Sequence, residues 1–354
     1  MTNRIPIIKV KSEVKKIANT NPNRRDVICL IGGFEEEIDE PKFYETLTAA
    51  EQDLGDDTSI DANAALKEIF HDDSITGVLV VDTTTHSGDT YTRTVGASEI
   101  ESALNSVAQI DFDLLYVAAE LSDAMITKIA DARDVRFEDK RPFDYVGVGT
   151  RATSGNAYDT TAGKLGDGCV AFLTQELNLN DSDDNLSLVE SGAFLTNLIA
   201  VTPVGNSLTA KILPEVTGLG TSYTFGSNDL GTKLVGLGYF VVRLVNPMTN
   251  TYECVNSAGV NGLDLYINRT LTYIVNEFAL RKYLGERNNQ ATLSGIEMEC
   301  NRLLQMFRND LGIVENITYA VEKENSYTVN VILNTVEFAD IITEIDVYIT
   351  IEVI

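Results

Sequence analysis

Few side chains in this sequence have the type and spacing that catalysis or metal binding requires. The chain has only two histidines, His71 and His86, and no H-x-x-x-H spacing joins them. Zinc sites use such closely spaced ligands. We therefore interpret His71, in Phe70–Asp73, as a residue at a helix end and His86 as part of a Thr-rich loop, and we expect no metal site.

One acidic segment, Asp181–Asn185, resembles the start of a calcium-binding loop. Leu186 stands where such a loop needs a Gly for its sharp turn, and Gly192 stands where it needs a bidentate Glu. The segment is therefore interpreted as a solvated acidic loop.

Nucleotide and acyl-transfer motifs are missing from the sequence. Gly147–Gly149 follows an apolar run but lacks the third Gly of a dinucleotide turn, and neither G-x-x-x-x-G-K-[ST] nor G-x-S-x-G occurs. We expect no cofactor and can single out no catalytic residue. An α/β enzyme with an unrecognised site stays open as an alternative.

Charge is distributed unevenly along the chain. The 354 residues carry a net charge of −26, whereas residues 1–25 hold seven basic side chains against Glu13 alone. That segment is therefore at +6, which leaves −32 for the remainder. An acidic body argues against nucleic-acid binding, because such proteins present a basic footprint. A basic arm could bind DNA or lipid, but it could equally dock on the acidic body of a neighbouring copy.

The lengths of the apolar runs and the spacing of the cysteines indicate the cellular compartment. No run reaches the roughly 20 apolar residues that span a bilayer, and the first apolar stretch, interrupted by Pro6, is too short for a signal peptide. The four cysteines form no C-x-x-C pair and are interpreted as structural thiols in a reducing compartment; they are Cys29, Cys169, Cys254 and Cys300. We expect synthesis and assembly in the host cytoplasm, without direct membrane insertion.

Residues 26–150 alternate buried strands with helices, which predicts an α/β layer with substantial parallel pairing. The expected strands are 27–31, 77–81, 114–118 and 145–149, and the expected helices are 62–70, 99–107 and 122–132. A further helix is expected near 160–175, short strands between 186 and 255, and helices at 264–283 and 292–310.

Both ends of the chain have the pattern of strands. In the last ten residues, Ile345, Val347, Ile349, Ile351 and Val353 share one face and polar residues share the other. A strand at a free terminus can insert into a sheet of another molecule. We hypothesise that the basic N-terminal arm and the acidic C-terminal region exchange between subunits; completion of the chain's own sheet is the alternative.

The order of these features resembles the sheath proteins of contractile phage-type tails, a family shared by phages, R-type bacteriocins and related injection systems. Asp26–Phe34 resembles the family's first strand after its arm, and Gly259-Val260-Asn261 resembles its G-V-N turn before a long helix. A second helix, an antiparallel pair and a close similar to Asp340–Ile349 follow. The family's frequent Trp-Gly-x-Arg-Thr-like strand is missing; Tyr239–Arg243 occupies its place.

The resemblance implies a non-enzymatic subunit that polymerises helically around an inner tube and contracts to drive it through a cell envelope. Its implied partners are other sheath subunits, the tube protein, and baseplate and tail terminator proteins, in a virion tail or extracellular particle. The implied exchanged strands contain Ile5, Ile7, Ile8 and Val10 at one end and Ile345, Val347, Ile349, Ile351 and Val353 at the other. The implied tube contacts are Arg281, Lys282, Arg287, Arg302 and Arg308.

The expected architecture is therefore an α/β (α+β) chain in three parts. These are an N-terminal arm at 1–25, an outer α/β domain with a mixed sheet at 26–200, and a C-terminal α+β sheath-type domain with an exchanged terminal strand at 201–354. Another self-assembling tail, tube or baseplate component is the alternative within the structural class.

Overall fold

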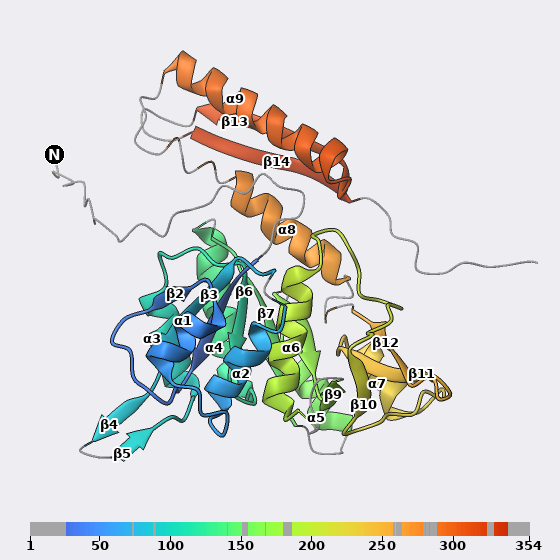
Figure 1. Cartoon of the computed structure of the whole chain (residues 1–354). Coiled ribbons are helices and arrows are strands. Elements are labelled where there is room, and N and C mark those ends of the chain that lie inside the picture. Colours follow the sequence, from blue (N-terminus) through green and yellow to red (C-terminus); the bar gives the residue numbers. More distant parts are fainter. Residues whose placement is uncertain are drawn as a thin grey trace, which may run out of the picture.

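The computed structural model describes residues 26–338, with gaps at 73, 88–89, 140, 151–154, 167, 180–185, 258, 260–263, 279, 281–282, 284–288 and 324–328. Within it, a six-stranded sheet in the order β2-β3-β1-β6-β7-β8 lies between two layers of helices (Figure 1). Neighbouring strands are parallel except the edge strand β2, which runs antiparallel to β3. The strands are β1 Val27–Gly32, β2 Lys42–Tyr44, β3 Gly77–Asp82, β6 Leu114–Val117, β7 Asp144–Val148 and β8 Cys169–Leu173. The predicted mixed α/β layer is confirmed.

The central strands are apolar on both faces, because helices cover both sides of the sheet. In β1, Ile28 and Leu30 point to one helical layer while Cys29 and Ile31 point to the other, and all four are fully buried. The first layer holds α1 Leu47–Leu54, α2 Asp61–Ile69 and α6 Leu188–Val201. The second layer holds α3 Ala97–Ser106, α4 Asp123–Glu138, α5 Gly155–Ala162 and α7 Leu230–Gly236.

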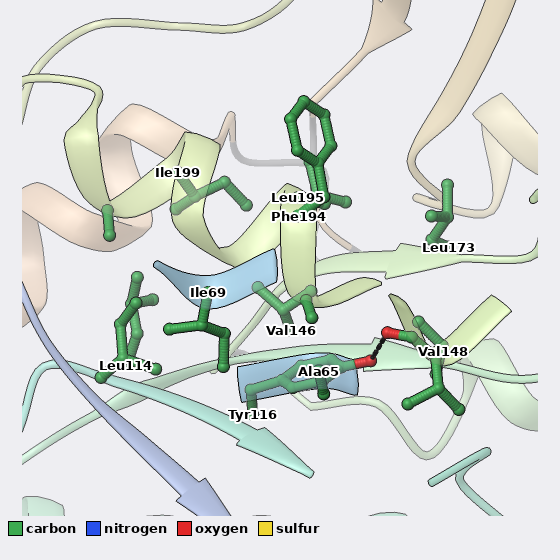
Figure 2. Packing of buried hydrophobic residues seen from close by; sticks show 14 of the residues in the cluster. Ala65, Ile69, Leu114, Tyr116, Val146, Val148, Leu173, Phe194, Leu195 and Ile199 are labelled. Carbon is green, nitrogen blue, oxygen red and sulfur yellow. Dashed lines mark hydrogen bonds between the residues drawn. The ribbon is translucent and has the colours of Figure 1, made fainter. Parts of the chain in front are cut away.

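Figure 2 shows α6 beside the sheet: Leu195 and Ile199 share one buried cluster with Tyr116 of β6 and Val146 of β7, whereas the Phe194 ring points away from these strands. The close approach depends on Gly192, because a Cβ atom there would lie 2.1 Å from Cγ1 of Val148. The Tyr116 hydroxyl donates a hydrogen bond to the carbonyl of Val189. The sheet and α6 therefore form one tightly packed unit.

Two expectations between 155 and 201 were wrong. The helix expected near 160–175 is the short α5 followed by β8, because Cys169–Leu173 is a continuous apolar run buried in the sheet. Helix α6 was missed among the expected short strands. Its signal was present, because Ser187 and Glu190 form a capping box at its start.

Three small two-stranded sheets complete the body. Two are hairpins, β4 Thr85–Ser87 with β5 Thr90–Thr92 and β11 Val241–Asn246 with β12 Thr251–Asn256, and in the third β9 Leu177–Leu179 pairs antiparallel with β10 Val216–Leu219, which follows α6. The buried amide of Gln175 ties β11 to the end of β8, because it accepts from the Val242 amide at 2.9 Å and donates to the Val242 carbonyl at 3.1 Å. This side chain continues the hydrogen bonding of the sheet toward the hairpin β11–β12.

The C-terminal part consists of α8 Leu265–Phe278, α9 Gln290–Gln305, a π-helical turn at Met306–Asp310, β13 Val314–Lys323 and β14 Val329–Phe338. The two helices expected at 264–283 and 292–310 correspond to α8 and α9. Figure 1 shows α9, β13 and β14 at one end of the molecule, with α8 between them and the sheet. The predicted division of the chain at residue 200 stays a prediction.

Candidate assembly surface and its junction with the body

The hairpin β13–β14 is the longest two-stranded sheet among the residues that the structure describes. Its two strands of ten residues pair antiparallel, and among the residues that the structure describes no other strand joins either of them. A two-stranded sheet alone is marginally stable in water. The hairpin therefore depends on what covers its faces and edges.

One face of the hairpin packs against α9. Ile296, Cys300 and Leu303 of α9 are buried together with Ile317 of β13, and the Tyr319 hydroxyl donates to the Glu297 carbonyl at 3.3 Å. On β14 the corresponding apolar side chains are only partly buried; these are Val329, Val331, Leu333 and Val336. The helix lies mainly over β13, so the β14 half of this face is less covered.

The other face of the hairpin is open to solvent. The facing pair Thr318 and Thr335 is exposed, and Ile332 is 39% exposed. The two outer edges present backbone N–H and C=O groups that no described strand pairs with. Such an edge offers an added strand both main-chain hydrogen bonds and side-chain positions. The hairpin can therefore accept a strand.

Helix α8 joins this hairpin region to the body. Its first residue, Leu265, lies in the core beside the sheet, whereas Tyr273, Ile274 and Phe278 lie in the core shared with α9 and the hairpin. The helix is thus embedded in two hydrophobic cores at its two ends. It is well placed to hold the two parts in one orientation.

Polar groups of α8 meet the amino-terminal edge of the sheet. Because the strands are parallel, Asp26 before β1, Asp113 before β6 and Asp144 at the start of β7 lie along that one edge. The Arg269 guanidinium pairs with the Asp26 carboxylate at 2.6 Å, and both side chains are buried, at 3% and 7% exposure. One turn later the Thr272 hydroxyl donates to Asp144 at 2.9 Å.

Burial dominates the electrostatics of this junction. It raises the pKa of Asp144 from 3.8 to about 7, against the opposing effects of Arg133, the Thr272 hydrogen bond and Arg269. Arg133 approaches Asp144 only to 4.0 Å. A cavity of about 10 Å³ lies between these groups, lined also by Val204 and Tyr273. The junction is a closely packed polar core, with space for about one water molecule.

The opposite edge of the sheet has the strand order of doubly wound folds, in which ligands bind where the order reverses. Here that point lies between β1 and β6, just after Gly32. It is filled by the chain itself, because a Cβ at Gly32 would lie 2.6 Å from Cβ of Ala62 and a Cβ at Gly33 would lie 2.6 Å from Cα of Arg93. The Arg93 side chain also donates to the carbonyls of Phe34 and Glu35. Residues of the chain itself therefore pack closely at this crevice, directly after Gly32.

The two histidines and four cysteines, which were considered for metal binding or reactivity, are packed against other side chains of the fold. His71 lies between Glu68 and Glu215 with its ring edge-on to Phe194, and His86 pairs with Glu37. No group of three or more metal-ligating side chains is present among the described residues. All four cysteines are free and buried. Burial raises the pKa of Cys29 and Cys169 to about 12, so neither thiol is ionised near neutral pH.

Gly147, considered for a dinucleotide turn, instead allows close packing, because a Cβ there would lie 2.7 Å from the Phe172 ring. No described helix has the length and hydrophobicity needed to cross a membrane. The acidic segment Asp181–Asn185 and most of the Gly259–Asn261 turn lie outside the described residues.

Most of the predicted assembly residues also lie outside the described residues. These are Ile5, Ile7, Ile8, Val10, Ile345, Val347, Ile349, Ile351, Val353, Arg281, Lys282 and Arg287. Two predicted tube contacts are described: Arg302 is partly exposed on α9 and pairs with Glu299 at 2.8 Å, and Arg308 is exposed on the π-helical turn. Their role at an interface stays a prediction.

Sequence reasoning missed the junction. Arg269 lies inside the helix expected at 264–283, but neither it nor Asp26 or Asp144 was singled out as a functional residue. A local signal existed, because the charged Arg269 lies between Leu265 and Tyr273 at helical spacing. Its partner lies 243 residues away in sequence, so no local pattern identifies it.

A scan against protein-family models and a search of curated proteins find no match. The fold, however, is similar to that of solved sheath proteins. A sheath tail protein of Desulfitobacterium hafniense superposes with a TM-score of 0.64 and 12% identity, covering 92% of this chain and 98% of that one. A sheath tail protein of Listeria innocua gives 0.64 and 13%, covering 89% and 94%.

A chain in the helical sheath of the anti-feeding prophage in its contracted state gives a TM-score of 0.63 and 12% identity, covering 99% of both chains. A chain in the baseplate of the same particle gives 0.65 and 10%, covering 99% of this chain and all of that one. The chain therefore has the fold of sheath tail proteins over nearly its whole length.

Proposed function

We propose that this chain is a structural, non-enzymatic subunit of a contractile tail sheath. It polymerises helically around an inner tube and shortens to drive that tube through a cell envelope. The observation that carries the proposal is the similarity of the fold to sheath proteins over nearly the whole chain. One of the similar structures is a helical sheath in its contracted state.

The hairpin β13–β14 is the proposed acceptor of strands from neighbouring copies. Among the described residues no other strand pairs with its two outer edges, and its β14 side is only partly covered; both features support this role. The proposed donors are the arm with Ile5, Ile7, Ile8 and Val10 and the last strand with Ile345, Val347, Ile349, Ile351 and Val353. A donor strand would pair along an edge, and its apolar face would extend the cover over β14.

Contraction requires subunits that rotate as rigid bodies while they stay connected. Helix α8 supports the first requirement, because it is embedded in the core of the body and in the core of the hairpin region. The exchanged strands would supply the second. Contraction would then increase the contact area between the bodies of neighbouring subunits. Summed over many copies, this gain would make contraction irreversible.

The tube side of the subunit is the proposed location of Arg281, Lys282, Arg287, Arg302 and Arg308. Arg302 and Arg308 lie on the outer surface of α9 and its π-helical turn. The remaining partners are baseplate and tail terminator proteins, and the proposed location is the host cytoplasm during assembly and the particle afterwards.

A sheath-type layer of the baseplate is the second candidate, because a chain in a baseplate structure matches as well as the helical sheath does. The two candidates differ in the length of the polymer. A sheath subunit forms long cylinders, whereas a baseplate layer stops at one or a few rings.

Electron microscopy of the purified protein tests the function directly. We expect hollow helical cylinders, and a chain that stays monomeric at all concentrations and salt conditions, with or without a tube, contradicts the proposal. Deletion of residues 345–354 should leave folded monomers that do not polymerise. Ile349→Asp should act like the deletion, whereas the matched change Thr350→Asp, on the polar face, should assemble.

Disulfide trapping separates exchange between copies from completion of the chain's own sheet. Thr350→Cys is combined with Thr318→Cys on β13 or with Thr335→Cys on β14, and the four native cysteines give little background because they are buried. Oxidation of polymers should yield a ladder of covalent oligomers on a denaturing gel. Oxidised chains that run only as monomers would show that the last strand stays in its own molecule.

A further inference from the structure

The point where the N-terminal arm meets the body lies beside the helix that leads to the C-terminal hairpin. Asp26 is the first residue after the arm and directly precedes β1, and Arg269 lies one turn into α8. Their side chains form a buried ion pair, although the residues are 243 positions apart. In a lattice of copies, neighbouring subunits would pull on the N-terminal arm and on the C-terminal hairpin. The segments that lead to these two parts, Asp26 and α8, therefore meet at one contact.

Several hydrogen bonds hold the pair in place. Arg269 also donates to the Thr202 carbonyl at 2.8 Å, so its guanidinium is held from two sides. The backbone beside Asp26 is held in turn, because the Val27 amide donates to the Asp113 carboxylate at 3.0 Å. Buried and hydrogen-bonded on both sides, the pair has little freedom to exchange partners with solvent.

We propose that the Asp26–Arg269 pair is a mechanical tie: it transmits tension from the N-terminal arm directly to α8 and the hairpin, so that the α/β sheet is not in the path of the load. The inference rests on the proposed function, in which the arm leaves to one neighbour and the hairpin receives strands from another. It assigns to these two residues a role in the connectivity of the lattice rather than in the folding of the body alone.

Without the tie the path of tension would be longer. Tension on the arm would reach the hairpin through β1, across the hydrogen bonds of the sheet to β7, and then through Thr272 on Asp144. The tension would also act on the first hydrogen-bonded residue pairs between β1 and its neighbouring strands, and these pairs would open one after another. A charged pair held at 2.6 Å in a buried site resists separation more than those single contacts do.

Pulling the full-length monomer by its two ends tests the tie without a polymer. In Arg269→Met, separation of α8 and the hairpin from the body should occur at a clearly lower force than in the wild type. Asp26→Asn, which keeps the shape and one hydrogen bond, should fall between the two. The control Arg136→Met removes an equally buried arginine of α4, whose guanidinium donates to the carbonyls of Val107 and Ile110, and should leave the first rupture force unchanged.

Hydrogen exchange on the same proteins gives an independent measurement. In Arg269→Met, amides of α8 and of β1 should exchange together about 100-fold faster or more, because one partner of a buried pair is left without its counter-charge. In Arg136→Met the acceleration should appear in α3 and α4 instead. Unchanged rupture force in Arg269→Met, or acceleration of α8 without β1, would overturn the tie.

Failure of the tie and failure of the proposed function give different results. If the wild type forms no polymer under any condition, the sheath role fails, whereas the pulling experiment still reports on the pair. If the wild type polymerises and Arg269→Met polymers survive shear as the wild type does, the pair does not carry the load and the tie fails while the sheath role stands.

Discussion

Replacing Asp144 with Asn should make the stability of this protein less sensitive to pH. Burial raises the pKa of Asp144 from 3.8 to about 7, since the surrounding Arg133, Thr272 and Arg269 only partly offset the loss of water and Asp26 adds repulsion. Between these two values the folded chain holds a proton that the unfolded chain has released. This group therefore favours folding most at low pH, and the contribution is lost as the pH rises toward 7.

The size of the effect follows from the two pKa values. A rise from 3.8 to about 7 corresponds to about 4 kcal/mol at 1.36 kcal/mol per pH unit, an upper value because a buried site relaxes on ionisation. The amide introduced by Asp144→Asn cannot ionise, and its oxygen can accept the Thr272 hydroxyl as the carboxylate does. We expect this variant to be about 1–1.5 kcal/mol more stable than the wild type at pH 5 and about 2–4 kcal/mol more stable at pH 8.

Urea unfolding of both proteins at pH 5 and pH 8 measures this difference, followed by circular dichroism because the chain has no Trp. The pH-dependent contributions of the other acidic groups to stability are the same in both proteins, so they cancel in the difference between the two. Thr272→Val is a control of opposite sign: it removes a donor that favours the charged carboxylate, so it should destabilise more at pH 8 than at pH 5. A difference between Asp144→Asn and the wild type that stays constant with pH would refute the reasoning.

Two further predictions concern packing and the tube surface. Gly192→Ala places a Cβ 2.1 Å from Val148 and should lower the free energy of unfolding, measured in urea, by about 3 kcal/mol. Gly236→Ala is the matched control: this glycine lies in a helix with open space around it, so the change should not destabilise the protein. Equal stabilities of the Gly192→Ala and Gly236→Ala variants would contradict the close packing of α6. Arg302→Glu with Arg308→Glu should change monomer stability by less than about 1 kcal/mol, because both side chains are on the surface. The same double change should reduce the amount of tube protein that sediments with sheath polymers, whereas Asn301→Gln with Asn309→Gln should not; undiminished sedimentation would remove these arginines from the tube surface.

Local patterns in the sequence were sufficient for most of the body. The strands at 27–31, 77–81 and 114–118 were predicted because each is a short apolar run between turn residues, and such runs are buried on both faces of a parallel sheet. Helices α2, α3, α8 and α9 were predicted from apolar residues at helical spacing. The prediction failed at Cys169–Leu173 and at α6, where nearly continuous burial removes the periodicity that separates strand from helix.

Residues that are close together in the chain specify the alternation of strands and helices, the acidic body with its basic arm, and the alternating pattern of the last ten residues, so each of these could be predicted before folding was considered. The packing of the layers, in contrast, brings Asp26, Asp144, Arg269 and Thr272 to one edge of the sheet and places Arg93 and Ala62 in the crevice at the other. These contacts at the first edge join residues more than 100 positions apart. A buried ion pair in particular is stable only when both partners are removed from water together, which no local pattern can specify.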